Sequence, residues 1–366
     1  MDTLNLKQLK LRNFRSHKSL DLDFSSNFVY FFGPNGVGKT NILEAISLFS
    51  PGRGLRGASI SDLTLSQSET FWNLSSLFKI SNVFIELEIG LDKKGKKTLR
   101  VDGKNKPLIY LTEILKIIWI TPLMDRLWIG GSSERRRFLD RLVMNFFPNH
   151  AKNCVLYEHA LKKRNFLFKE NVNDIAWFLA VEKQLAEIGY LIDKNRREVI
   201  EIIIEMQISM EKKGHFPILK LELDTYPIKN SEDLFEELQK SRKTDFKAKR
   251  TLNGPHKTDL LVSHGLKKMQ AKNCSTGEQK SLLLSFFILS SLAISKKFRK
   301  PPVILLDEIV AHLDKENLTI FLDQLISINA QIFATGTDKK NLDILPADTV
   351  SYSLDWNGGE SKVFQS

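Results

Sequence analysis

Cysteines and long apolar runs are both scarce in this chain of 366 residues. The two cysteines, Cys154 and Cys274, are far apart and lack the spacing of metal ligands, so we expect free thiols in a reducing compartment. The longest apolar run, 282–294, contains three serines and is shorter than a membrane-crossing helix, so it predicts a buried helix. The N-terminus lacks the apolar segment of a signal peptide. We therefore expect a cytoplasmic protein with no membrane partner.

Acidic residues are outnumbered by basic ones, 43 to 54, which gives a net charge of +11. Residues 1–150 hold 22 Lys and Arg against 14 Asp and Glu, so +8 of the excess lies there. A basic excess favours a polyanion such as nucleic acid as partner, with the N-terminal part as the more basic face. A basic protein with no such partner fits the charge equally well, so charge alone leaves the choice open.

Short strands alternate with helices in the N-terminal and C-terminal parts of the chain. Residues 6–14 and 20–24 have period-two patterning, whereas 28–32 and 303–307 are continuous apolar runs of the kind found in buried parallel strands. Further strands are predicted at 84–91, 98–103, 116–122, 259–265 and 331–335, and helices at 41–49, 275–294 and 315–328. This alternation predicts an α/β fold with a mixed, mostly parallel sheet and flanking helices.

Helix-forming and charged residues dominate the middle of the chain, from about 126 to 250. Residues 135–147, 155–168 and 180–213 have apolar stripes at helical spacing, the last interrupted only by Gly189. Heptads are not sustained, which favours a packed helical subdomain over a coiled-coil arm. The basic stretch 241–250 is expected at the surface.

The stretch GPNGVGKT, residues 33–40, matches the phosphate-loop pattern G-x-x-x-x-G-K-[ST] in full. Its glycines let backbone amides face phosphate oxygens, Lys39 reaches the β- and γ-phosphates, and Thr40 offers a hydroxyl to Mg²⁺. The stretch lies between a predicted buried strand and a predicted helix, which is the context that this loop requires. The predicted nucleotide-phosphate site consists of Gly33, Pro34, Asn35, Gly36, Val37, Gly38, Lys39 and Thr40.

A second half of such a site is predicted at VILLDEI, residues 303–309. An apolar strand that ends in Asp307 places a carboxylate where it can hold Mg²⁺ through water. Glu308 follows at the polar end of the strand and can polarise an attacking water as general base. The alternative, that both carboxylates only cap the next helix, is weakened by the intact phosphate loop.

The stretch CSTGEQK, residues 274–280, precedes the apolar run and has two compatible interpretations. In the first, Ser275 is the N-cap of a helix and Glu278 its third helical residue, which makes a capping box. In the second, free amides at the helix start bind an anion. The second interpretation raises the question of why one chain carries two phosphate sites so far apart.

The pattern S-x-G-x-Q before a helix, followed by an apolar strand ending in Asp-Glu, resembles the signature motif of ABC-type ATPases. In that family two heads face each other, and the signature of one closes on the nucleotide of the other. Cys274 and Thr276 depart from the family pattern, which often has Leu and Gly at these positions. The resemblance implies a signature acting in trans through Ser275, Thr276, Gly277, Glu278 and Gln279.

Two further stretches follow the ABC pattern in part. VAHLD, residues 310–314, resembles the D-loop, with Asp314 as its final carboxylate. QIFATGTD, residues 331–338, lies where the family has a switch histidine, but it contains none. The resemblance therefore assigns the switch position to Thr335 or Thr337.

The N-terminal LKLRNFRSHKSLDLDF resembles the opening of chromosome-maintenance ATPases of the SMC, Rad50 and RecF group, in which the equivalent of Arg15 lies near the nucleotide. Only 234 residues separate Thr40 from Ser275, which excludes the long coiled coil of SMC and Rad50 proteins. SPGRGLR (50–56), residues 121–143 and GPHKTDL (254–260) also resemble segments of RecF, the compact member. The resemblance implies a P-loop ABC-type ATPase head formed by 1–125 and 250–366, with a helical arm, 126–249, inserted between them.

Membership of this family implies a slow ATPase used as a switch in recombinational repair, replication and the response to DNA damage. ATP, with Mg²⁺, drives formation of a homodimer that binds single-stranded and gapped duplex DNA and promotes RecA loading with RecO and RecR; hydrolysis then resets it. Contacts to DNA should be made mainly to phosphates. Their candidates are Lys7, Lys10, Arg12, Lys18, Arg53, Arg56, Lys93, Lys94, Lys96, Lys97 and residues 104–106.

Two other functions share these motifs. One is that of another chromosome ATPase of the SMC/Rad50 clan, which should carry a coiled-coil insertion. The other is that of the ATPase subunit of a membrane transporter, which should have a glutamine loop and a switch histidine, and neither is evident in the sequence. Both remain alternatives that the sequence disfavours.

Overall fold

Period-two patterning near the N-terminus produces a six-stranded antiparallel sheet in the order β2-β1-β4-β5-β6-β7. Its strands are β1 (Leu4–Phe14), β2 (His17–Asp23), β4 (Asn73–Ile80), β5 (Val83–Leu91), β6 (Lys97–Val101) and β7 (Lys104–Lys106). The register between β1 and β4 shifts between Leu6 and Gln8. This bulge changes the phase of the alternation, so that Leu4 and Leu6 before it and Leu9 and Leu11 after it are all buried.

The continuous apolar runs form a second six-stranded sheet, in the order β15-β14-β3-β13-β12-β8. Its strands are β3 (Phe28–Phe32), β8 (Ile117–Ile120), β12 (Val303–Leu306), β13 (Ile332–Gly336), β14 (Val350–Asn357) and β15 (Glu360–Gln365). All neighbouring pairs are parallel except β14 with β15. The predicted mostly parallel sheet is therefore this one, and β13 lies between the strands that precede the phosphate loop and the acidic pair.

The computed structural model of the chain describes residues 3–65, 71–210, 216–226, 228–308, 315–357 and 360–365. By its internal contacts the chain divides into two compact units. Unit 1 is Met1–Asp125 with Phe286–Ser366, and unit 2 is Arg126–Ser285. The domain boundaries given above from the sequence stay a prediction.

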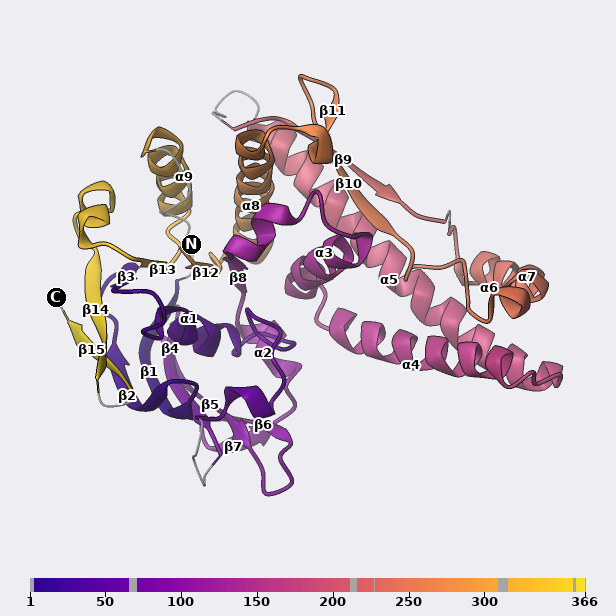
Figure 1. Cartoon of the computed structure of the whole chain (residues 1–366), viewed down its shortest axis with the longest axis horizontal. Coiled ribbons are helices and arrows are strands. Elements are labelled where there is room, and N and C mark those ends of the chain that lie inside the picture. Colours follow the sequence, from indigo (N-terminus) through magenta and orange to yellow (C-terminus); the bar gives the residue numbers. More distant parts are fainter. Residues whose placement is uncertain are drawn as a thin grey trace. The chain divides into compact units, whose positions relative to one another are not determined.

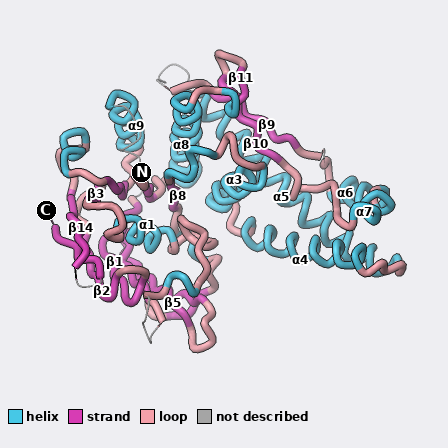
Figure 2. Tube along the Cα trace, in the orientation of Figure 1, coloured by secondary structure: helices cyan, strands magenta, loops and turns pink. Residues whose placement is uncertain are grey.

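Unit 1 contains both large sheets, drawn in magenta in Figure 2. Its helix α1 (Lys39–Ser47) contacts β1 of the antiparallel sheet and both β8 and β13 of the parallel one. Ile42, Ala45 and Ile46, which the sequence placed on one apolar face, are fully buried. Two further helices of this unit are α2 (Tyr110–Ile114) and α9 (Lys315–Ser327). The phosphate loop is thus anchored by a helix that packs on both sheets.

Unit 2 consists of helices and a small antiparallel sheet with the order β11-β10-β9. The helices are α3 (Ser132–Phe146), α4 (His150–Lys169), α5 (Ile175–Met210), α6 (Ser231–Lys240) and α7 (Arg242–Ala248), and the strands are β9 (Leu219–Asp224), β10 (Asp259–His264) and β11 (Met269–Gln270). In Figure 1, α4 and α5 lie side by side as an antiparallel pair. Gly189 does not interrupt α5, which continues from Ile175 to Met210. A Cβ at this position would lie 2.8 Å from Leu234 and 3.1 Å from Tyr157, which is too close for a larger residue. The glycine therefore allows close packing.

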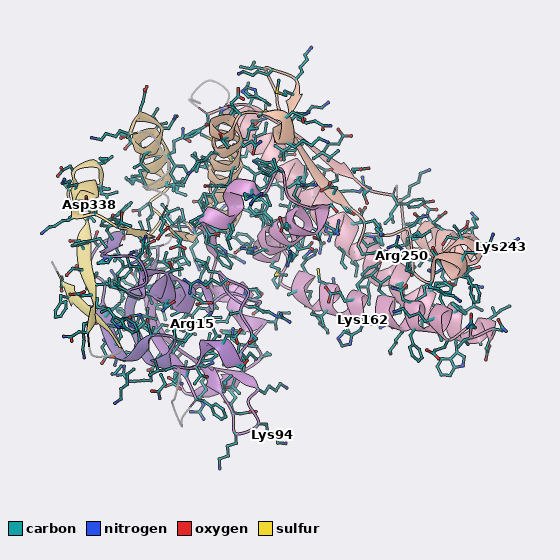
Figure 3. All side chains as sticks on the ribbon, viewed as in Figure 1. Arg15, Lys94, Lys162, Lys243, Arg250 and Asp338 are labelled. Carbon is teal, nitrogen blue, oxygen red and sulfur yellow. The ribbon has the colours of Figure 1, made fainter. Side chains whose placement is uncertain are left out.

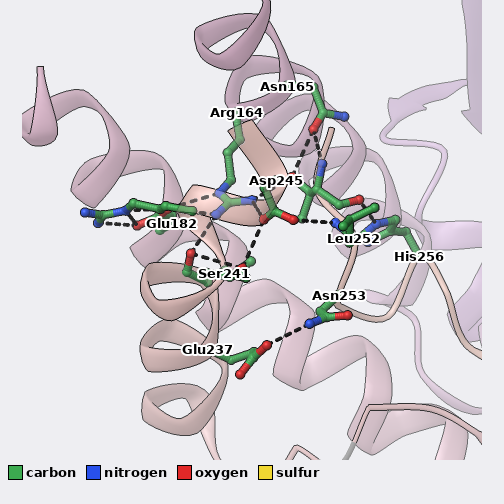
Figure 4. Close-up of polar contacts among 12 residues, drawn as sticks. Arg164, Asn165, Glu182, Glu237, Ser241, Asp245, Leu252, Asn253 and His256 are labelled. Atoms are coloured by element: carbon green, nitrogen blue, oxygen red, sulfur yellow. Dashed lines mark hydrogen bonds and ion pairs between the residues drawn. The ribbon is translucent and has the colours of Figure 1, made fainter. Parts of the chain in front are cut away.

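A buried ionic network joins α4, α5 and α7 within unit 2 (Figure 4). Arg164 donates to Glu182 Oε1 at 3.1 Å, to Asp245 Oδ2 at 2.5 Å and to Thr251 Oγ1 at 2.9 Å. The side chains of Arg164, Glu182 and Asp245 are completely buried. Arg242 contributes a second cation to Glu182. Every charge in the network thus has an opposite charge within hydrogen-bonding distance.

Helix α8 (Thr276–Phe298) contains the apolar run and crosses the boundary between the units. Among the described residues it is the only helix with the length and apolar composition to cross a membrane, and 72% of that window is buried inside the protein. A core helix has this degree of burial, as the sequence predicted for 282–294.

Several elements were missed. The stretch 241–250 lies largely at the surface, as predicted, but it also contains α7, whose Asp245 is fully buried and pairs with Arg164. Strands β4, β9, β14 and β15 and helix α6 were not predicted. Strand β14 has an irregular burial pattern and pairs with β3 from the other end of the chain, whereas β9, LKLELD, alternates regularly and its period-two signal was overlooked.

Candidate nucleotide-binding site

The phosphate loop adopts backbone angles that require glycine at two positions. Gly33 has a φ of 149°, and a Cβ there would lie 2.3 Å from the carbonyl oxygen of Leu354. Gly38 has a φ of 96°, and a Cβ there would lie within 2.6 Å of the hydroxyls of Ser16 and Ser361. Close packing as well as backbone conformation therefore fixes these glycines, and the loop leads directly into α1 at Lys39.

Lys39 is buried, and its ammonium donates to the carbonyl oxygens of Gly33 and Pro34, both at 2.7 Å. Desolvation by burial lowers the pKa of Lys39, and the negative charges of Glu308 and Asp307 oppose that shift. Two neutral acceptors hold the ammonium at the loop. An anionic ligand would supply the opposite charge that this buried cation favours.

One chain of hydrogen bonds connects the phosphate loop to the acidic pair. Thr40 Oγ1 donates to Asp307 Oδ1 at 2.8 Å, and the same oxygen accepts from Thr335 Oγ1 at 2.9 Å. The Thr335 hydroxyl in turn accepts from the backbone N–H of Glu308 at 2.9 Å. Glu308 has a φ of 51°, a conformation uncommon outside glycine. The structure therefore brings Thr40, Asp307 and Glu308 together through Thr335.

The oxygen pair formed by Thr40 and Asp307 fits a magnesium ion. Hydroxyl, carboxylate and water oxygens are the ligands that Mg²⁺ prefers, and the ion usually keeps several waters. Thr40 Oγ1 would be a direct ligand, and Asp307, whose Oδ1 lies 2.8 Å from it, is near enough to hold the ion through water. Desolvation raises the pKa of Asp307, as expected for a carboxylate that gains from a nearby cation. The donor set thus suits the predicted ion.

The two switch candidates lie in different environments. Thr335 is fully buried on β13, and its hydroxyl both donates to Asp307 and accepts from Glu308. Thr337 lies just beyond the end of β13 and is exposed. Thr335 therefore acts on the acidic pair from inside the fold, whereas Thr337 is the candidate that a ligand can reach.

Arg15 lies beside α1 and has a φ of 54°. Its guanidinium forms two hydrogen bonds with Glu44, each at 2.8 Å, and donates to the carbonyl oxygen of Asp62 at 2.7 Å. The Glu44 side chain is fully buried and also lies 3.6 Å from Arg56. Glu44 was missed in the sequence, although one acid among the apolar residues of 41–49 is a signal of a buried ion pair.

The signature stretch forms a capping box at the start of α8. The Ser275 N–H donates to Glu278 Oε2 at 2.8 Å, its hydroxyl donates to the same oxygen at 2.9 Å, and the Glu278 N–H points back to the hydroxyl at 3.4 Å. The structure thus contains the capping box of the first interpretation. Ser275, Thr276 and Gly277 are exposed. The anion-binding interpretation stays a prediction.

Gln279 and Cys274 support the stretch from within unit 2. The Gln279 side chain is buried and donates to the carbonyl oxygen of Cys274 at 2.9 Å, while Trp128 Nε1 donates to the carbonyl oxygen of Gln279 at 2.9 Å. The Cys274 thiol is buried beside the carbonyl oxygen of Gln270 at 3.5 Å. Gln279 therefore positions the loop, and Cys274 acts as a small buried residue.

Gly277 has an environment unlike that of the phosphate-loop glycines described above. Its φ is outside the positive range, and a Cβ placed on it would meet nothing within 4 Å. Within the described part of the chain, neither backbone strain nor a steric contact requires glycine here. The D-loop carboxylate Asp314 and the rest of VAHLD lie outside the described residues.

Some of the predicted DNA-contacting cations already have partners. Arg12 pairs with Asp21, Arg56 donates to Asn41 at 2.8 Å, and the Lys97 ammonium donates to the carbonyl oxygen of Leu48 at 3.2 Å. Burial lowers the pKa of Lys97 to about 8. The other candidates of the β5–β6 turn are exposed, and Figure 3 shows Lys94 pointing away from the ribbon.

A groove of about 730 Å³ lies along β5, β6 and β7 of unit 1. Four cations line it, together with two acids: Lys96, Lys97, Arg100, Lys106, Glu88 and Asp92. Glu88 lies 3.8 Å from Arg100, and the Asp92 carboxylate accepts from the backbone of its own turn. The groove therefore has an excess of positive charge.

Solved structures with the same fold are ATPase heads. The recombination mediator protein RecF-ATPrS in the RecFOR pathway superimposes with a TM-score of 0.85 at 24% identity, covering 98% of each chain. The Smc head domain from Pyrococcus furiosus, solved with an extended coiled coil, gives 0.56 at 19% identity. The fold is the predicted ABC-type ATPase head with an added helical unit, and no helix in the described part of this chain continues into a long coiled coil.

Sequence relatives point in the same direction. The family model for the RecF/RecN/SMC N terminal domain matches residues 5–345. The DNA replication and repair protein RecF of Rhizobium rhizogenes is 37% identical over 346 residues, covering 91% of this chain and 92% of that protein. The protein of the same name from Brucella suis is 36% identical, covering 96% and 95%. This chain, as its phosphate loop, acidic pair and signature stretch predicted, belongs to the RecF family.

Proposed function

We propose that this protein is a cytoplasmic, ATP-driven switch of DNA replication and recombinational repair. ATP binding joins two copies, the dimer binds gapped duplex or single-stranded DNA and promotes RecA loading with RecO and RecR, and slow hydrolysis resets it. The hydrogen-bonded chain from Thr40 through Asp307 and Thr335 to Glu308 carries the proposal, because it connects a phosphate loop to an acidic pair.

The proposed roles in the nucleotide half follow from these contacts. Lys39 would leave its two carbonyl acceptors to contact the β- and γ-phosphates. Thr40 and Asp307 would hold Mg²⁺, which neutralises phosphate charge when bound. Glu308 would polarise the attacking water as general base, with Thr335 fixing its backbone. Arg15 would help to position α1, and with it the phosphate loop, through its hydrogen bonds to Glu44. Thr337 would sense the γ-phosphate.

The signature stretch would serve the nucleotide of the other copy. Support comes from Gly277: its surroundings are open, so a partner that approaches closely gives the physical reason for a glycine there. Ser275 and the Gly277 N–H would then contact the γ-phosphate across the interface. The distance in the sequence between 33–40 and 274–280 ceases to matter if the two stretches meet on different chains.

The DNA contacts would include the cations of the groove on β5, β6 and β7. An excess of positive charge along a sheet suits phosphates of either strand, without base recognition. Affinity for gapped duplex should then fall steeply as salt rises. Equal affinity in low and moderate salt would argue against this surface, and a Lys96→Glu, Lys106→Glu variant that binds DNA as the unchanged protein does would exclude it.

Light scattering tests the dimer. We expect a monomer alone and a dimer with ATP and Mg²⁺, with Glu308→Gln trapping the dimer and Lys39→Ala weakening its formation. Ser275→Arg should keep ATP binding and lose the dimer, because the larger side chain would obstruct the contact with the nucleotide bound to the other copy and not the nucleotide site of its own chain. A strict monomer at micromolar concentration with ATP and DNA would refute the switch, and loss of ATP binding in Ser275→Arg would place the signature in cis.

A further inference from the structure

Glu278 of the signature stretch has an ionic partner that the capping box does not need. Lys267, in the turn between β10 and β11, forms an ion pair with Glu278 Oε1. The other carboxylate oxygen, Oε2, accepts both from the Ser275 N–H and from the Ser275 hydroxyl. Lys267 and the Ser275 donors hold the pKa of Glu278 at about 2. Glu278 is therefore a carboxylate anion at neutral pH.

This anion lies beside the hydroxyl that the proposed function assigns to the γ-phosphate. Glu278 Oε2 is 2.9 Å from Ser275 Oγ. A phosphate oxygen hydrogen-bonded to the same hydroxyl would lie within roughly 6 Å of that carboxylate oxygen. Two like charges at that separation repel each other, and the arriving nucleotide carries several negative charges.

The Ser275 hydroxyl also has only one proton to donate. That proton is used by Glu278, so a phosphate oxygen can accept it only if the bond to Glu278 is given up. Glu278 then keeps the Ser275 N–H and Lys267 as its donors. Lys267 is thus the partner that stays with the carboxylate while the hydroxyl turns to the phosphate.

We infer that Lys267 is a positioning residue of the signature: it neutralises Glu278, so that the Ser275 hydroxyl can donate to the γ-phosphate held by the partner beside an acidic side chain. The inference rests on the proposed function, in which the signature acts in trans. It goes further in assigning a role in nucleotide engagement to the β10–β11 turn, which lies outside the signature, the phosphate loop and the acidic pair.

The test measures the ATP concentration that gives half-maximal dimer, by light scattering at low salt, with ATP or a slowly hydrolysed thio analogue. Lys267→Met keeps most of the aliphatic stem and removes the charge. We expect it to raise that concentration on the order of three- to tenfold, from the Coulomb repulsion of an exposed pair. Lys267→Arg should restore the original value.

A double-substitution cycle separates neutralisation from other effects. Glu278→Gln retains a capping side chain without the charge, and we expect it to lower the ATP requirement. In the Glu278→Gln background, Lys267→Met should have no further effect. Lys272→Met, which removes an equal charge from an exposed position near the signature, is the matched control and should stay near the original value. High salt should reduce the Lys267→Met effect, because exposed charges are screened.

The outcomes distinguish failure of the proposed ATP-driven dimer from failure of the role of Lys267 alone. If the unchanged protein forms no dimer with ATP, the switch itself fails and the role of Lys267 fails with it. If it does form one, equal values for Lys267→Met and Lys272→Met overturn the role of Lys267 alone. Loss of the dimer in Glu278→Gln would also overturn it, since the carboxylate itself would then be required. Unchanged thermal unfolding and ATP binding by the monomer show that the variants are folded.

Discussion

Each unit buries charged side chains, but the two clusters differ in how their charges are compensated. In unit 2, Arg164 is completely buried against two carboxylates, those of Glu182 and Asp245. In unit 1, Lys39 is 3% exposed, and its ammonium donates to two neutral carbonyl oxygens. The difference teaches that burial of charge has two uses. A closed network fixes the packing of helices, whereas a cation hydrogen-bonded only to neutral acceptors favours the arrival of an anion.

The largest expected effect breaks the closed network. Arg164→Met leaves Asp245 buried without its cation, so we expect the free energy of unfolding to fall by about 3–5 kcal/mol. Urea unfolding followed by circular dichroism measures it. Arg242→Met removes the partly exposed cation from Glu182, which keeps Arg164, and should cost much less. Equal losses in the two variants would mean that the network is not the closed unit described here.

Acid should weaken unit 2 through His256. The ring donates from Nε2 to the carbonyl oxygen of Thr251 at 3.1 Å, so Nδ1 of the neutral ring accepts from the Tyr157 hydroxyl at 2.9 Å. Burial lowers the pKa of His256 to about 4. The unfolded chain, with a pKa near 6.5, binds the proton more readily. The stabilisation is therefore present above pH 6.5 and is lost as pH falls toward 4, by about 3 kcal/mol.

Unfolding curves of the intact chain at several pH values measure that loss. His256→Gln cannot titrate, so its free energy of unfolding should change less between pH 6.5 and 4 than that of the unchanged protein. A pH dependence equal in both proteins would show that another group is responsible.

Loss of the cation from the cluster around Lys39 should have the opposite effect on the free energy of unfolding. Lys39→Met removes a desolvated charge, so we expect the protein without nucleotide to be as stable as before or more stable by about 1–2 kcal/mol. The thermal stabilisation that ATP gives the unchanged protein should disappear. A marked loss of stability in Lys39→Met would make this cluster structural, like that of unit 2.

The smallest effect is expected at the surface. Arg12 pairs with Asp21 on neighbouring strands, but their side chains are 41% and 54% exposed. Exposed pairs contribute about 0–1 kcal/mol, so Arg12→Ala should change the free energy of unfolding by no more than that. Urea unfolding of this variant gives the contribution of an exposed ion pair to the free energy of unfolding, with which the loss in Arg164→Met can be compared.

The parts of the site that could be predicted from the sequence are those whose chemistry is local. GPNGVGKT and the acidic pair each place their groups within a few residues of one another, next to strands with strong apolar runs. The roles of Thr335 and Glu44 could not be predicted in this way. Thr335 lies 27 positions from Glu308, and Glu44 lies 29 from Arg15, and only the pairing of β12 with β13 and the packing of α1 bring them together.

The same reason explains what the prediction of the fold missed. Asp245 belongs to a stretch that is basic on average, and its burial depends on an arginine 81 positions earlier. Strand β14 pairs with β3 from the other end of the chain, and its own burial does not alternate regularly. Periodicity identifies an element that buries one regular face, and it misses elements whose environment comes from the rest of the chain.

The empty surroundings of Gly277 affect how mutations in this chain should be scored. A survey of variants by thermal melting or expression level would rank this position as tolerant, because a larger side chain there displaces nothing in its own molecule. The same variants would fail only in assays run at protein concentrations and ATP levels that populate pairs of molecules. A harmful allele at this position would therefore be abundant in the cell, fully folded and able to bind ATP.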